Sequence, residues 1–169
     1  MRNRAMSSNL IVATPAIIVA ILLALSAAAG QKLVPFKGSL QGSEIDTPEG
    51  GPPPTTLSVD GSTTGLATHV GQFSFSYHLT VTLATGHATG TGHLIAANGD
   101  SIDTTIEGQG TETDTPNVDS IVEMNIITGG TGRFSEARGN LTVERLLNMV
   151  TGVTSGSFQG TITSPGATH

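Results

Sequence analysis

The sequence contains no cysteine and no tryptophan among its 169 residues, and only 12% of the residues are charged. Without cysteine, the chain can form neither disulfide bonds nor thiolate metal ligands. The low charge and the 22 glycines are typical of short strands joined by tight turns rather than of long helices. We therefore expect an all-β protein whose stability comes from packing.

Positive charge is also scarce. Of the seven Lys and Arg residues, Arg2 and Arg4 lie near the start of the chain, whereas all 13 acidic residues lie at or after Glu44. A surface this acidic repels phosphate backbones and anionic lipids. We therefore predict no nucleic-acid partner.

The N-terminus has the organisation of a leader. A short basic start precedes Leu10–Ala29, which is almost entirely apolar, and Ala27 and Ala29 fit the small-x-small pattern read by signal peptidase. We predict that residues 1–29 form a helical signal peptide and that the rest is secreted or otherwise extracytoplasmic. The alternative is an uncleaved signal anchor, because about 20 apolar residues can span a bilayer. In that case residues 10–29 are the only membrane contact.

The remaining residues, 30–169, have the usual size of one domain. The clearest periodicity lies in Gln72–Leu83, where apolar and polar side chains alternate without a break. This pattern predicts a long strand with one apolar face. His87–Ala97 and Ser101–Gln109 flank the pair Asn98-Gly99, which predicts a hairpin with a type I′ turn.

Several other runs alternate in the same way. Seven or eight short strands without intervening helices favour an up-and-down antiparallel β-barrel of about eight strands. A proline-rich segment near the start of the domain interrupts the pattern and predicts a loop. The further strands are predicted at Leu33–Gln41, Ile121–Thr128, Leu141–Val150 and Val153–Ile162, and the loop at Glu44–Pro54.

A glycine-dense segment at Ile127–Val143 (ITGGTGRFSEARGNLTV) resembles the corresponding segment of allene oxide cyclases and plant dirigent proteins. It is nearest to exported bacterial members of that group, which Ala67–Gly71 and Ala96–Asp100 also resemble. The resemblance implies a calycin-like eight-stranded barrel, a homotrimer and an interior that holds a small apolar or reactive molecule. It assigns no catalytic residue, because neither Glu44 nor Glu123 lies in a matching segment.

We interpret the glycine segment as structural. Its glycines allow a tight reversal where a side chain would clash, and its single aromatic residue is suited to plug one end of the barrel. A phosphate loop is excluded, since Arg and Phe follow the turn where that loop needs Lys and then Ser or Thr. The motif comprises Gly129, Gly130, Gly132, Phe134 and Gly139.

Two glutamates are the candidate catalytic residues. Glu123 alternates with apolar neighbours and would face the interior beside Asn125, although a solvated outward face is commoner for glutamate. Glu44 is the second candidate, and any such group needs burial inside the barrel to shift its pKa. Weaker acid–base candidates are Glu107, His78 and Tyr77, and the candidate ligand-binding residues are Phe73, Phe75, Tyr77 and Asn125.

The histidines do not predict a metal site. His69, His78, His87 and His93 include no H-x-H or H-x-x-x-H pair, so a metal would require ligands gathered across strands. We predict neither a metal nor another cofactor.

The leading functional hypothesis is an exported barrel that binds a small apolar molecule in its interior. One alternative is an isomerase or cyclase that confines a reactive lipid or phenolic intermediate. The other is a structural or interaction protein with a filled barrel, so the sequence leaves open whether the protein is an enzyme. An interior filled by Phe73, Phe75, Tyr77, Met124 and Phe158 would weaken the first two hypotheses.

Overall fold

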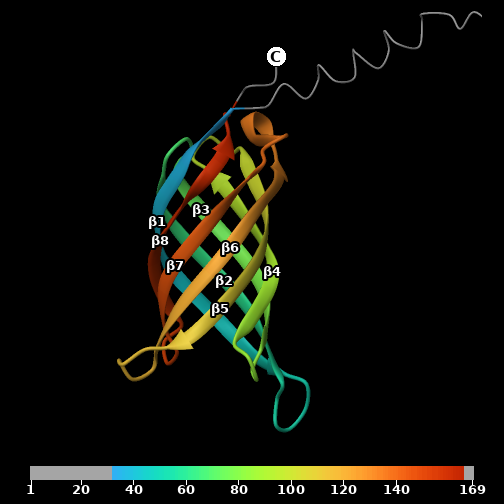
Figure 1. Cartoon of the computed structure of the whole chain (residues 1–169), viewed down its shortest axis with the longest axis vertical. Helices are drawn as coiled ribbons and strands as arrows, with labels where there is room; N and C mark the ends of the chain where they lie inside the picture. The colour runs from blue at the N-terminus through green and yellow to red at the C-terminus, as the bar shows by residue number, and fades with distance from the viewer. Residues whose placement is uncertain (1–31, 166–169) are drawn as a thin grey trace, which may run out of the picture. The chain divides into compact units, whose positions relative to one another are not determined.

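The computed structural model describes residues 32–165, which form one closed antiparallel barrel of eight strands (Figure 1). Each strand pairs with its neighbours in the chain, and β8 pairs back with β1. This confirms the prediction of an all-β, antiparallel barrel of about eight strands. The strands are β1 (Leu33–Glu49), β2 (Thr56–Ala67), β3 (Gly71–Thr82), β4 (His87–Ala96), β5 (Ser101–Glu112), β6 (Val118–Gly130), β7 (Gly139–Asn148) and β8 (Val153–Thr163).

The predicted leader, residues 1–29, lies outside the described residues. Between residues 32 and 165, no helix has the length and apolar character needed to cross a bilayer.

The first strand extends further than the sequence predicted. The expected loop at Glu44–Pro54 was wrong at its start, because β1 continues to Glu49 and pairs with β2 up to that residue. Pro48 is tolerated because its missing N–H faces the β8 side, where pairing with β1 ends at Ser43. Glu44 is therefore a strand residue with an inward, buried side chain.

Strand β2 was not identified from the sequence, because Thr56–Ala67 is rich in Ser, Thr and Gly. The inward-facing residues of β2 are small for a packing reason. Strand β2 lies beside β3, whose inward side chains include Phe73 and Tyr77. A Cβ at Gly61 would overlap the Tyr77 ring. The small residues of one strand therefore make room for the aromatic residues of the next.

The hairpin of β4 and β5 is confirmed, but the predicted type I′ turn was wrong. Gly99 has a φ of +88°, while Asn98 is not among the positive-φ residues of the described chain. The amide of Gly99 donates to the carbonyl of Ala96, and the amide of Ala96 donates to the carbonyl of Asp100. This is the three-residue loop in which a type I turn is followed by a left-handed glycine.

The end of the barrel that holds the β6–β7 connection is closed. A short 3₁₀ turn, η2 (Gly132–Phe134), lies over this end (Figure 1), and the Phe134 ring is fully buried. Beneath it the apolar core includes Phe36 and Phe158, whose rings meet edge to face with centroids 5.2 Å apart. We call this half of the barrel the packed half.

Candidate functional site

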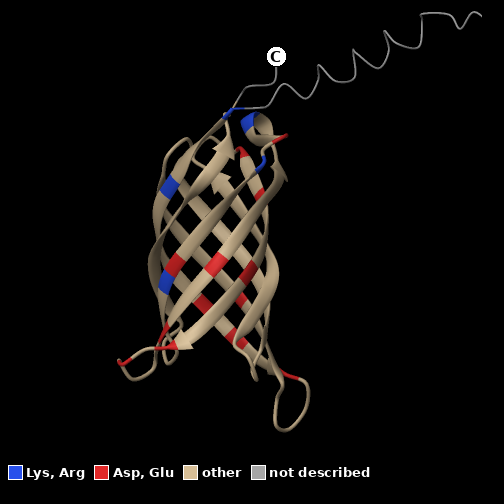
Figure 2. Ribbon diagram, in the orientation of Figure 1, with Lys and Arg blue, Asp and Glu red and all other residues tan. Residues whose placement is uncertain are grey.

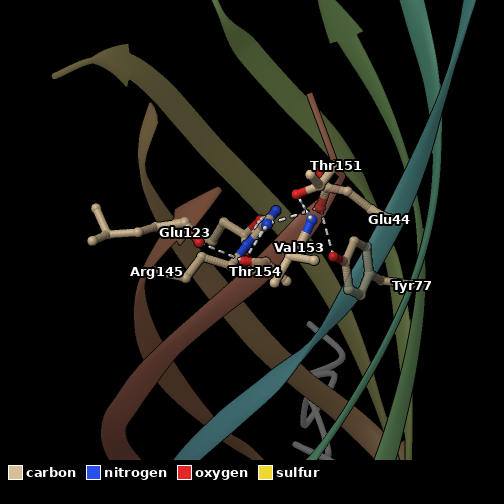
Figure 3. Close-up of polar contacts among 8 residues, drawn as sticks. Glu44, Tyr77, Glu123, Arg145, Thr151, Val153 and Thr154 are labelled. Atoms are coloured by element: carbon tan, nitrogen blue, oxygen red, sulfur yellow. Dashed lines mark hydrogen bonds and ion pairs between the residues drawn. The ribbon is translucent and has the colours of Figure 1, made fainter. Parts of the chain in front are cut away.

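A group of polar side chains lies inside the barrel, and we call it the buried polar cluster. Its members come from five different strands, so that only barrel closure brings them together (Figure 3). Three of them are carboxylate or guanidinium side chains, and the other two bear hydroxyl groups. The cluster consists of Glu44, Tyr77, Glu123, Arg145 and Thr154.

Arg145 is at the centre of the cluster. Its Nη1 donates to Glu44 Oε2 at 2.8 Å and to Thr154 Oγ1 at 3.1 Å. Its Nη2 and Nε donate to Glu123 Oε1 at 2.9 and 3.3 Å. The guanidinium and both carboxylates are at most 7% exposed. Two buried carboxylates thus share one buried cation, which leaves the trio with a net negative charge.

Tyr77 completes the cluster on the β3 side. Its hydroxyl donates to Glu44 Oε2 at 2.6 Å, and the Arg145 guanidinium lies 5.4 Å from the centre of its ring. The Glu44 oxygen therefore accepts two hydrogen bonds. The other oxygens, Glu44 Oε1 and Glu123 Oε2, make no hydrogen bond with any residue between 32 and 165.

The environment of the cluster shifts the pKa of several groups. Burial lowers the pKa of Arg145, but the charge of Glu123 and the contacts with Tyr77 and Glu44 outweigh it, so that the net shift is upward. Burial raises the pKa of Tyr77 far above its ordinary value, and Glu44 adds to this shift. Both groups therefore keep their usual protonation state well beyond neutral pH.

Asp46 is a third carboxylate on the same face of β1. Burial raises its pKa, and the charge of Glu44 raises it further, while Arg145 acts in the opposite direction. Its Oδ1 is buried and finds no hydrogen-bond partner in the described part of the chain. A buried acceptor without a partner is costly in a folded protein, so a donor from a bound molecule would stabilise this position.

A cavity of about 340 Å³ occupies the other half of the barrel, and we call it the chamber. The buried carboxylates and guanidinium of Glu44, Glu123 and Arg145 line one part of it. Leu83 and Met149 also line it and are 44% and 45% exposed, so the chamber reaches solvent near the β3–β4 and β7–β8 turns. Its apolar walls include Leu57, Val59, Leu79, Val81, Ile121 and Leu147.

The chamber is strongly acidic. Besides Glu44, Glu123 and Asp46, its lining includes Glu112 and Asp119, against a single cationic side chain. Figure 2 shows acidic positions around the loops at this end of the barrel, whereas most basic positions lie toward the opposite end. A bound molecule would therefore meet apolar walls and a negative electrostatic potential.

The candidate ligand-binding residues divide between the two halves. Phe73 and Phe75 lie in the packed half with Phe158, where the remaining void is only about 30 Å³. Asn125 is also buried there and accepts a hydrogen bond from Thr104. Met124 does not fill the interior, because it faces outward and is 56% exposed. Of the candidates, only Tyr77 reaches the buried polar cluster.

The structure places both catalytic candidates, Glu44 and Glu123, in the interior and in contact with one arginine. The outward face considered for Glu123 is instead occupied by Val122 and Met124. Of the weaker acid–base candidates, Tyr77 is also in the interior. His78 and Glu107 lie outside the barrel, where His78 pairs with Asp60 and Glu107 with His87.

The glycine motif lies at the closed end, far along the strands from the chamber. Gly129 and Gly130 end β6, Gly132 and Phe134 belong to η2, and Gly139 begins β7. A Cβ at Gly130 would overlap the backbone oxygen of Ser101. Within residues 32–165, no group of three or more histidines and carboxylates is arranged to hold a metal.

Sequence reasoning missed Arg145, Asp46 and Thr154. A signal for Arg145 was present, because it shares the alternation of Leu141, Val143 and Leu147 and so falls on the apolar face of its strand. A charged residue at such a position is buried only when it is paired. Asp46 was hidden by the incorrect loop prediction.

Comparison with known proteins adds no relative: no protein-family model matches this sequence, and no curated protein matches it.

Proposed function

We propose that the protein is an exported barrel that binds one small, mainly apolar molecule in the chamber. The observation that carries this proposal is the division of the interior, where one half is filled by side chains and the other keeps an apolar cavity of about 340 Å³. That volume is near the lower end of the range for small-molecule pockets. The occupant would be small and largely enclosed.

The fold is consistent with the calycin-like barrel that the glycine segment suggests, since the eight strands close in chain order. Export and trimer formation, which come from the leader pattern and the resemblance, belong to the same proposal. An interior half-filled by side chains favours binding over a purely structural role.

Filling the chamber tests the proposal. Val81→Trp places an indole in the chamber wall, whereas Thr80→Trp places one on the outer face of the same strand as a matched control. We expect the purified protein to carry a co-purified small molecule in native mass spectrometry, or to bind one from a panel of short alkyl compounds. Val81→Trp should abolish this binding and Thr80→Trp should preserve it. Binding that survives Val81→Trp in a folded protein would contradict the proposal.

The second candidate function is an isomerase or cyclase, and the free oxygens of Glu44 and Glu123 favour it. Either oxygen would accept a proton from a bound molecule and return it at another atom. Arg145 holds one oxygen of each glutamate in place and leaves the other oxygen facing the chamber. Glu123→Gln would then abolish turnover while leaving binding intact, whereas a binding protein would show no turnover in either form.

A further inference from the structure

We infer that the chamber selects a small amphiphile with a cationic head group, such as an alkyl ammonium, and rejects amphiphiles with a carboxylate head. This inference rests on the proposed function, because it specifies the class of molecule that the same chamber takes. It follows from the balance of charge in the lining, from the hydrogen bonds already made there and from the apolar walls.

The charges of the lining favour a cation. Five carboxylate side chains face the chamber against one guanidinium. Glu44 and Glu123 are buried, and in surroundings of low dielectric constant a charge acts on a buried ligand more strongly than it would in water. A carboxylate head group would be repelled, and an ammonium group would be attracted.

Arg145 is not free to receive an anion. It makes four hydrogen bonds to Glu44, Glu123 and Thr154, out of the five N–H groups that a guanidinium has. Its charge is also balanced by two carboxylates in direct contact. A ligand anion would have to displace one of these buried pairs, which leaves a buried glutamate without its partner.

The carboxylates of the chamber lining have unoccupied acceptor positions. Glu44 Oε1 and Glu123 Oε2 make no hydrogen bond within residues 32–165, and Asp46 Oδ1 is buried without a partner. Ionised carboxylates accept hydrogen bonds and cannot donate them. Only a ligand that brings donors, as an ammonium group does with three N–H bonds, satisfies them.

Asp46 is the carboxylate best placed to receive the head group. It lies on the inward face of β1 and lines the chamber close to Val59, with which it pairs across the strands. Its buried oxygen has a free acceptor site next to apolar walls that suit an alkyl chain. The head group and the chain of a short amphiphile would thus be bound by adjoining parts of one cavity.

A matched series of probes tests the inference. Octylammonium, octanol and octanoate have the same chain length and differ in head group, and their affinities for the purified protein are measured by calorimetry at neutral pH. We expect octylammonium to bind tightest and octanoate weakest. Asp46→Asn should weaken the binding of octylammonium by about tenfold or more, because it replaces the charged acceptor of one hydrogen bond by a neutral one.

The control variant is Asp60→Asn, which removes the same charge from the outer face of β2 and should leave all three affinities unchanged. Equal or tighter binding of octanoate would overturn the cationic preference and leave the proposed function standing. An octylammonium affinity unchanged by Asp46→Asn would overturn the role of Asp46. If none of the three probes binds, both the inference and the proposed function fail.

Discussion

Arg145 Nη1 lies 2.8 Å from Glu44 Oε2, although 101 positions separate the two residues in the chain. They belong to β7 and β1, which are both neighbours of β8 in the closed barrel. The contact therefore depends on closure of the barrel and on the inward alternation of both strands. Loss of this contact should therefore lower the stability of the whole barrel rather than disrupt one strand.

Removing the cation should destabilise the protein strongly. Arg145→Met leaves Glu44 and Glu123 buried without a counter-charge, and we expect a loss of about 3 to 5 kcal/mol in the free energy of unfolding. Urea denaturation followed by circular dichroism measures it. The triple variant Arg145→Met, Glu44→Gln, Glu123→Gln should recover much of the loss, because no charge is then left unpaired. A loss below about 1 kcal/mol in Arg145→Met would show that the cluster is solvated.

Tyr77 gives a direct optical test, because it is the only tyrosine and the chain has no tryptophan. Burial and Glu44 raise its pKa far above the ordinary value of 10.0. The native protein should therefore show no tyrosinate absorbance in an alkaline titration until it unfolds. Absorbance that rises with a midpoint near pH 10 while the circular dichroism stays native would contradict the buried position.

The same shift in the pKa of Tyr77 determines how the stability of the protein changes with pH in alkaline solution. An unfolded chain releases the Tyr77 proton above pH 10 and the folded chain keeps it, so the free energy of unfolding should fall as pH rises past that value. Tyr77→Phe removes this slope. At neutral pH the variant should lose about 1.5 kcal/mol, because the hydrogen bond to Glu44 is absent.

Asp46 should make the free energy of unfolding depend on pH between about pH 4 and neutral pH. Its pKa is raised in the folded state from 3.8, so the folded state holds a proton that the unfolded state has already released. Stability therefore falls as pH rises from about 3.8 through the folded pKa, and this penalty persists above it. Asp46→Asn should be more stable than the native protein at neutral pH, with the difference shrinking toward pH 4. Thermal unfolding of both proteins across that range checks the sign, and a less stable variant at neutral pH would contradict it.

Gly130 should tolerate no side chain. A Cβ there would overlap the Ser101 backbone, and we expect Gly130→Val to cost more than about 2 kcal/mol in stability or to prevent folding. Gly110→Ala is the control, since the nearest atom to a Cβ at that position is the end of the Ile121 side chain at 3.2 Å. A well-folded Gly130→Val protein of native stability would contradict the close strand approach at the closed end.

The barrel could be predicted from the sequence because period-two alternation is a local property, and Gln72–Leu83 shows it without a break. The candidate site was predicted only in part. Glu44 and Glu123 were identified as residue types, but their common partner Arg145 was not, because contacts between β1, β6 and β7 depend on strand order and closure. Strand β2 was missed for a related reason. Its glycines make room for the aromatic residues of β3, and this contact is visible only once the two strands are paired.

The division of the interior could not be read from residue patterns. Phe73 and Leu79 lie on the same alternating face of one strand, yet the first packs in the filled half and the second lines the chamber. Which of them faces a cavity depends on the volumes contributed by the other seven strands. Sequence periodicity gives the face of a residue but not its depth in the barrel.

Closure by β1 and β8 has a practical consequence. Leu33 pairs with Thr163, so the described chain enters and leaves the barrel side by side at the end covered by Phe134 (Figure 1). Immobilisation on a sensor surface through a linker at either terminus would hold the protein by that end and leave the chamber mouth accessible. Joining the two termini and opening the chain at residues 50–55 would give a circular permutant in which all eight strands keep their neighbours.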